Sequence, residues 1–203
     1  MLKEATRIAV LVSGGGTNLQ ALIDAEKAGK LKSGKIQLVV GSNPGAYGLK
    51  RAEAAGIPSC WVDSKDQDFE GKLLALLRKH RIQMVILAGF MCILSREFVR
   101  EYADRIINIH PSLIPSFCGK GMYGLKVHEA ALSYGVKVTG ATVHLVNEIP
   151  DGGRILIQRA VEIQEGDTPE VLQKRVMEQA EWKILPEAAE AVALEIGKED
   201  GNL

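Results

Sequence analysis

Short apolar runs alternate with longer amphipathic segments along most of the chain. Runs of β-branched and aliphatic residues predict buried strands at 8–12, 36–40, 59–62, 84–88 and 106–109. Apolar residues at helical spacing predict helices over about 18–28, 46–55, 66–80, 95–102 and 125–134. This alternation of strand and helix is typical of an α/β protein, in which crossover helices connect the strands of a parallel sheet.

The C-terminal third has a different pattern. Strands are expected over 136–146 and 155–161, and the turn at Pro150-Asp151-Gly152-Gly153 would let them pair as a hairpin. Asp167-Thr168-Pro169-Glu170 has the capping residue, proline and acid that open a helix, here the last long one. The sequence therefore predicts an open, twisted, mostly parallel sheet flanked by helices, of Rossmann type, with a C-terminal antiparallel hairpin. No linker or repeat divides residues 1–203, so a single domain is expected.

Composition narrows the function classes. Hydrophobic residues make up 46% of the 203 residues, as in a soluble globular protein, and 25 basic residues balance 25 acidic ones. A chain without net positive charge has no general attraction to nucleic acid or to anionic membranes, so neither is expected as a partner. No apolar run approaches the ~20 residues that span a bilayer, and the run at 8–12 is too short for a signal peptide.

The cysteines point to a reducing compartment. Cys60, Cys92 and Cys118 are odd in number and lack metal-ligand spacing, which favours free thiols in the cytoplasm. No cluster of His, Cys, Asp and Glu has metal-ligand spacing elsewhere, so no metal is expected.

The segment Ser13-Gly14-Gly15-Gly16-Thr17-Asn18 joins the first strand to the first helix. Glycines let the backbone approach a ligand closely, and a helix N-terminus favours an anion. The segment lacks the Gly-Lys-Ser/Thr end of a Walker A loop, and Leu19 stands where the dinucleotide fingerprint needs its third glycine. We therefore expect a site for a single phosphate, helped by Thr17 and Asn18; the alternative is a simple tight turn.

A second candidate site follows the strand at 106–109. Asn108 and His110 are two residues apart, so their side chains share one face at the edge of the sheet where α/β proteins bind ligands. An amide beside an imidazole suits acyl transfer, because both can donate hydrogen bonds to a developing oxyanion. The following stretch at 111–123 has no periodicity, and loops of that length in compact domains are usually functional.

Other candidates are less specific. A carboxylate at Asp151 near His110 would stabilise the protonated imidazole, although Asp-Gly is also a common hairpin turn. His144, in mid-strand, could line the site, but a core or supporting role is the stronger expectation. His128 lies on a predicted helix beside Glu129 and is expected at the surface or packed under a loop. The apolar segment at 87–94 could flank a flat ring system, or could simply pack.

Four of these segments, in this order, resemble the folate-dependent glycinamide ribonucleotide formyltransferases, and the resemblance runs from Ile8 to about Pro186. They are Ser13-Gly14-Gly15-Gly16-Thr17-Asn18, Ala88-Gly89-Phe90-Met91, Asn108-Ile109-His110-Pro111-Ser112-Leu113-Ile114-Pro115 and Asp151-Gly152-Gly153. The resemblance implies a formyltransferase-like fold. It also implies transfer of the formyl group of 10-formyltetrahydrofolate, as co-substrate, to the amine of glycinamide ribonucleotide in de novo purine biosynthesis.

The resemblance also assigns residues. It implies catalytic roles for Asn108, His110 and Asp151, with His144 near the site. It implies that the ribonucleotide is bound by Gly16, Thr17, Asn18 and Glu181. It implies that the folate is bound by Lys65, Met91, Cys92, Ile93, Leu94, Asn108, Asn147, Glu148, Ile149, Pro150 and Asp151. The N-terminal half, about 1–105, would bind the ribonucleotide, and the C-terminal half, about 84–190, would provide catalysis and folate binding.

The chain departs from the family pattern at three places. Cys92 replaces an arginine, and no arginine for the acidic tail of the folate occurs at 64–68, which leaves Lys65. Trp182 replaces the histidine that usually follows Glu181, and the spacing from Asp167 is one residue longer.

Several alternatives share part of this pattern. Formyltetrahydrofolate deformylase would use water as acceptor but carries an extra N-terminal regulatory domain. Methionyl-tRNA formyltransferase adds a basic C-terminal RNA-binding domain. A non-catalytic phosphate-binding module would keep the glycine loop without needing Asn108, His110 and Asp151. Small-molecule substrates and a monomer or homodimer are expected.

Overall fold

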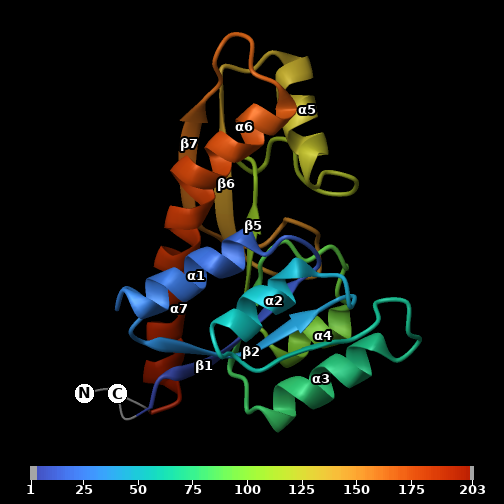
Figure 1. Cartoon of the computed structure of the whole chain (residues 1–203), viewed down its shortest axis with the longest axis vertical. Helices are drawn as coiled ribbons and strands as arrows, with labels where there is room; N and C mark the ends of the chain where they lie inside the picture. Colours follow the sequence, from blue (N-terminus) through green and yellow to red (C-terminus); the bar gives the residue numbers. More distant parts are fainter. Residues whose placement is uncertain (1–3, 202–203) are drawn as a thin grey trace.

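The computed structural model describes residues 4–201, which form a seven-stranded sheet covered by helices on both faces (Figure 1). The strand order is β3-β2-β1-β4-β5-β6-β7. The strands are β1 (Thr6–Val12), β2 (Gly34–Gly41), β3 (Ser59–Trp61), β4 (Met84–Leu87), β5 (Ile106–His110), β6 (Val138–Leu145) and β7 (Ile155–Glu162). All pairs among the first five strands are parallel, and the pairs β5–β6 and β6–β7 are antiparallel. The predicted fold class, including the C-terminal hairpin, is confirmed.

The helices begin and end close to their predicted positions. They are α1 (Thr17–Lys27), α2 (Tyr47–Ala54), α3 (Phe69–Lys79), α4 (Arg96–Glu101), α5 (Leu125–Tyr134), α6 (Pro169–Val176) and α7 (Trp182–Glu199). Two predicted caps are present, because the Ser95 hydroxyl accepts the N–H of Phe98 and the Thr168 hydroxyl accepts the N–H of Val171. No helix of the described residues combines the length and the apolar character needed to cross a bilayer.

The core is divided by the sheet into two layers. Along β1, Ile8, Val10 and Val12 face one layer while Ala9 and Leu11 face the other, as strand alternation requires. Helices α1, α2, α6 and α7 contribute to the first layer, and α3 and α4 contribute to the second. A sheet buried on both faces explains why these strands are apolar throughout.

The order of the strands reverses between β1 and β4. From β1 the chain adds β2 and β3 on one side, and then returns to add β4 and β5 on the other. Loops that leave the carboxyl ends of β1 and β4 therefore turn in opposite directions and leave a crevice between them. The glycine loop follows β1 and lies at this crevice.

The last long helix is interrupted. Residues Met177–Glu181 form a π-helical turn between α6 and α7. In a π turn the hydrogen bonds join residues five apart instead of four, so the register of the side chains changes between α6 and α7. Both Ala180 and Glu181 in this turn are buried.

Candidate active site

A cavity of about 420 Å³ opens at the carboxyl ends of the central strands. Its walls come from the start of α1, the segment after β4, the end of β5, the loop at 119–124, the loop at 146–151 and one face of α6 and the π turn. The predicted residues from distant parts of the chain, Asn18, His110 and Glu181 among them, line it together. The cavity thus occupies the crevice that the topology creates.

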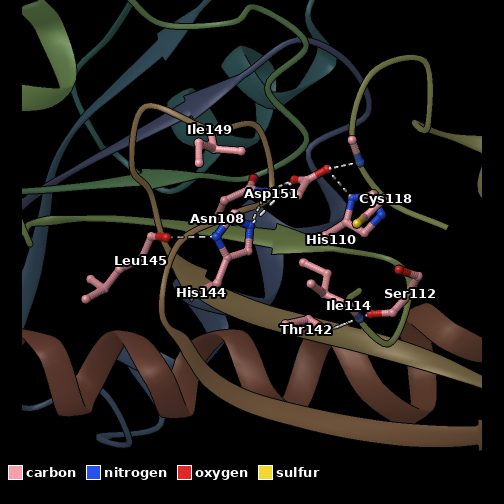
Figure 2. Close-up of polar contacts among 12 residues, drawn as sticks. Asn108, His110, Ser112, Ile114, Cys118, Thr142, His144, Leu145, Ile149 and Asp151 are labelled. Atoms are coloured by element: carbon pink, nitrogen blue, oxygen red, sulfur yellow. Dashed lines mark hydrogen bonds and ion pairs between the residues drawn. The ribbon is translucent and has the colours of Figure 1, made fainter. Parts of the chain in front are cut away.

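Asn108 and His110 point into the cavity from the end of β5 (Figure 2). They alternate with Ile107 and Ile109, which pack into the core on the opposite face. The Nε2 atom of His110 lies 2.9 Å from the carbonyl oxygen of Phe117, so it carries a proton and donates it. The Nδ1 atom lies 3.7 Å from Oδ2 of Asp151, where a protonated imidazole would face the carboxylate.

His144 is held beside Asn108 by strand pairing, since the two residues are partners in the β5–β6 ladder. Its Nδ1 lies 2.8 Å from the Leu145 carbonyl oxygen and therefore carries a proton. Its Nε2 lies 3.1 Å from Nδ2 of Asn108 and 3.6 Å from Oδ1 of Asp151 (Figure 2). The histidine fixes the orientation of the amide, which agrees with the supporting role expected for it.

Asp151 stands in the turn between β6 and β7 with a left-handed backbone, φ 55°. The turn needs its glycines: a Cβ on Gly153 would lie 1.7 Å from the Leu145 carbonyl oxygen. Burial alone would raise the pKa of Asp151. The neighbouring His144 ring, the hydrogen bond from the Gly119 N–H and the charge of His110 together outweigh burial and lower that pKa. The carboxylate is therefore ionised at neutral pH.

The loop at 111–124 contributes backbone groups to this cluster. Its carbonyl at Phe117 accepts from His110, and its N–H at Gly119 donates to Oδ2 of Asp151 at 2.8 Å. Its start is fixed to β6 because the Thr142 hydroxyl donates to the Ser112 carbonyl and accepts the Ile114 N–H (Figure 2). The absence of periodicity marked this loop as functional, but only the structure shows which of its atoms act.

His128 is not at the surface: it is fully buried and lines the cavity. Burial, and next the charge of His110, lower the pKa of His128 to about 4, so its imidazole is neutral at pH 7. Neither ring nitrogen has a hydrogen-bond partner among the described residues. The helical spacing of Val127, His128 and Ala131, all buried on α5, is the sequence signal for this position.

The glycine loop, residues 13–18, has backbone N–H groups that are free to bind a ligand. The carbonyls of Gly14 and Gly15 accept hydrogen bonds from Gly48 N–H and Arg51 Nε, both on α2. No hydrogen bond of the described residues uses the N–H groups of Gly14, Gly15 or Gly16. Gly16 must be glycine, because its φ is +68° and a Cβ would lie 2.6 Å from the Gly48 Cα.

At Gly14 and Gly15, unlike at Gly16, no steric contact within the described protein requires glycine. A Cβ on either would meet no atom within 4 Å, so the space beside them is open. Gly16 and Thr17 do not line the cavity wall, whereas Asn18 does. The Thr17 hydroxyl instead contacts the sulfur of Met177 at 3.6 Å.

Glu181 reaches the cavity from the π turn and is 6% exposed. Its Oε2 accepts a hydrogen bond of 2.6 Å from Nδ2 of Asn18. Within residues 4–201 no Lys, Arg or His forms an ion pair with it. Burial raises the pKa of Glu181 to about 7, although the Asn18 hydrogen bond opposes the rise. A buried acid without a cationic partner is suited to a ligand that brings a donor.

Two segments with exposed apolar side chains line the other end of the cavity. One is 91–94 after β4 and the other is 147–150 before Asp151, and every residue of both lines the wall. Met91, Ile93 and Ile149 are 51%, 77% and 65% exposed. Exposed apolar walls of this kind fit a flat ring system. Lys65 is exposed and does not line this cavity; its N–H donates to Asp63.

Sequence reasoning did not single out Gln173 or Met177 as cavity residues, and it predicted a functional loop at 111–123 without naming the residues in it that line the cavity. Of the residues that the structure describes, no group of three or more His, Cys, Asp and Glu could hold a metal ion.

Comparison with known proteins gives concordant matches. The sequence profile described as formyl transferase matches residues 6–189. Phosphoribosylglycinamide formyltransferase, chloroplastic, of Arabidopsis thaliana is 40% identical over 202 residues, covering 96% of this chain and 68% of that protein. The human trifunctional purine biosynthetic protein adenosine-3 is 44% identical over 195 residues, covering 94% of this chain but only 19% of that protein. The chain therefore spans less than a fifth of the length of this trifunctional relative.

Solved structures agree with the sequence matches. Glycinamide ribonucleotide transformylase 1 of Symbiobacterium toebii superposes with a TM-score of 0.86 at 39% identity, covering 93% of this chain and 88% of that one. The phosphoribosylglycinamide formyltransferase of Anaplasma phagocytophilum gives a TM-score of 0.85 at 38% identity, covering 95% and 89%.

Proposed function

Because the chain belongs to the formyl transferase family, we propose that it transfers the formyl group of 10-formyltetrahydrofolate to the amine of glycinamide ribonucleotide in de novo purine biosynthesis. One observation carries the proposal: Asn108, His110 and Asp151 converge in a cavity that Asn18, next to the glycine loop, lines at one end and the segments 91–94 and 147–150 line at the other. In this proposal residues of about 1–105 supply most of the ribonucleotide site, and residues of about 84–190 supply the catalytic groups and the folate site.

The ribonucleotide would lie with its phosphate at the glycine loop. Free N–H groups at Gly14–Gly16 and the N-terminus of α1 supply the positive potential that a phosphate needs. Thr17 and Asn18 would complete this end. Glu181, bonded to Asn18, would accept hydrogen bonds from the glycinamide part of the substrate.

The folate would place its pterin between the segments 91–94 and 147–150. Met91, Ile93 and Ile149 would contact the ring system, and backbone groups of both segments, including that of Cys92, would bind its polar edge. Lys65 lies outside the cavity wall and would act only on the acidic tail of the folate. Cys60, Cys92 and Cys118 are free thiols, in keeping with a reducing compartment such as the cytoplasm.

The reaction follows from this placement. The neutral amine attacks the formyl carbon, and the carbonyl oxygen becomes an oxyanion. An Nδ2 hydrogen of Asn108 is available to it, since the contact from that atom to Asp151 is long, 3.5 Å. Protonated His110 would donate through Nδ1, because its Nε2–H is already bound to Phe117. Such donors are worth ~3–4 kcal/mol in acyl transfer.

Collapse of the intermediate completes the transfer. The bond between the formyl carbon and N10 of the folate breaks as tetrahydrofolate leaves. The attacking nitrogen loses one proton and N10 gains one, so no outside acid or base is consumed. Asp151, ionised at neutral pH, would stabilise the protonated imidazole and receive the proton in transit, directly or through water.

An absorbance assay for the tetrahydrofolate product tests this function. The proposal expects product only when glycinamide ribonucleotide is present, with one formylated ribonucleotide formed per folate released. Equal product formation without the ribonucleotide would instead establish a deformylase. A third outcome is no product with either the ribonucleotide or water as acceptor. If the ribonucleotide and the folate still raised the melting temperature, the protein would bind both ligands without catalysing transfer.

A further inference from the structure

The loop at 147–151 covers one wall of the cavity and carries Asp151 at its end. Its internal hydrogen bonds set its shape: Ile149 N–H donates to the Asn147 side chain, and Gly152 N–H donates to the Ile149 carbonyl. These bonds do not attach the loop to the rest of the protein. Attachment must come from other contacts.

Two residues of the loop provide it, Asp151 and Glu148. Asp151 bonds to Gly119 and approaches Asn108 in the catalytic cluster. Glu148 forms two ion pairs with α4: its Oε2 lies 2.7 Å from Nε of Arg96, and its Oε1 lies 3.1 Å from Nε of Arg100. Each oxygen of the Glu148 carboxylate thus has its own guanidinium.

Helix α4 is a firm platform for these arginines. Phe98 and Val99 anchor it in the core at 0% and 6% exposure. Ser95 caps it, and Glu70 of α3 accepts the Ser95 N–H at 2.7 Å. Arg96 and Arg100 are four residues apart and so lie on one helical face. Helix α4 also directly follows 91–94, so the ion pairs connect the two walls of the proposed folate cleft.

Each of these two ion pairs is weak by itself. The arginine side chains are 59% and 66% exposed, and exposed ion pairs are individually weak and screened by salt. Two of them on one carboxylate hold the loop more firmly than either alone. A folate can therefore enter without a large barrier and then be covered.

We propose that Arg96 and Arg100 are positioning residues that, through Glu148, hold the 147–151 loop closed over the folate. They do not touch the reacting atoms. The inference rests on the proposed function, because it takes the cleft between 91–94 and 147–150 to be the folate site. It also gives Glu148 a different role from the folate-binding one that the family resemblance implies: its carboxylate binds the two arginines of α4 and anchors the loop.

The test is the double variant Arg96→Gln with Arg100→Gln. We expect KM for the formyl-folate to rise about threefold to tenfold, the equivalent of one to two weak ion pairs. The KM for the ribonucleotide and kcat should stay within about twofold. Raising salt should raise the folate KM of the unmodified protein and leave that of the double variant almost unchanged.

Arg78→Gln is the matched control. It breaks an ion pair of similar exposure, 63% and 44%, between α3 and Glu101 on the same helix α4, and Glu101 does not touch the loop. It should leave the folate KM unchanged. Glu148→Gln should also raise the folate KM, because it removes the carboxylate that both arginines bind. A charge exchange, Glu148→Arg with Arg96→Glu and Arg100→Glu, restores opposite charges and should recover much of the lost folate affinity.

The proposal is overturned by an unchanged folate KM in the double variant, by an equal rise in Arg78→Gln, or by parallel rises in the KM of both substrates. Failure of the proposed function is a separate result, because the unmodified protein would then show no ribonucleotide-dependent transfer at all.

Discussion

Asp151 concentrates more contacts than any other side chain of the candidate site. Its carboxylate accepts from Gly119, lies within 4 Å of His110 and His144, and approaches Asn108. The sequence left it undecided between a turn residue and a catalytic one, and the structure places it in the turn with its carboxylate beside both histidines. The turn gives it a strained backbone, and the turn also directs its side chain to the imidazoles.

Asp151→Asn is expected to lower kcat roughly a hundredfold or more, because it removes the charge that stabilises protonated His110 while keeping the shape. Circular dichroism and thermal unfolding should show a folded protein, and Asp66→Asn, which changes an acid on the surface, should keep normal turnover. A kcat within a few-fold of normal for Asp151→Asn would remove Asp151 from the mechanism.

Glu181 gives the protein a distinctive dependence of stability on pH. The pKa of Glu181 is about 7 in the folded protein, against 4.5 for an ordinary glutamate, so the folded state holds a proton that the unfolded state releases. Stability contributed by the protonated acid is present below about pH 4.5 and is lost as pH rises through 7.

Glu181→Gln should therefore be more stable than the unmodified protein at about pH 8, by about 3 kcal/mol, and nearly equal to it at about pH 4.5. Denaturant unfolding at both pH values measures the difference. A constant difference at the two pH values would mean that Glu181 ionises normally.

At the scale of single elements, the sequence indicated most boundaries but not the irregular ones. The strands and crossover helices were predictable because burial on both sheet faces leaves long apolar runs. The π turn at 177–181 was not, since its residues have no composition that distinguishes a π turn from an α-helical one. His128 shows the same limit: one polar residue on a buried helical face depends on its tertiary neighbours, His110 among them.

The glycine loop supports a prediction that separates binding from folding. Gly15→Ala adds a methyl group into open space at an ordinary φ, so stability should change by less than about 0.5 kcal/mol. The same methyl group would obstruct a phosphate, so KM for the ribonucleotide should rise about tenfold or more, while KM for the folate stays unchanged. Steady-state kinetics and thermal unfolding of the variant check both parts.

Gly16→Ala provides the contrast, because its left-handed φ and its close approach to Gly48 should make the variant unstable. If Gly15→Ala left both KM values unaltered, the loop would be only a strand-to-helix turn.

For the whole molecule, the topology explains why the site is where it is. The reversal of strand order between β1 and β4 opens a crevice at the carboxyl ends of the strands, and β5 brings Asn108 and His110 to its edge. The antiparallel hairpin then returns His144 and Asp151 to the same point. Sequence pattern predicted this frame and most of its polar residues. It could not predict the loop positions, such as Phe117 and Gly119, where backbone atoms act whatever the side chain.

The most direct test is a crystal structure with glycinamide ribonucleotide and a folate analogue that cannot release its formyl-like carbonyl. The account predicts that carbonyl oxygen at about 3 Å from both the Asn108 amide and the His110 imidazole, with the phosphate on the N–H groups of Gly14–Gly16. An analogue bound outside this cavity, or a carbonyl directed away from these two side chains, would contradict it.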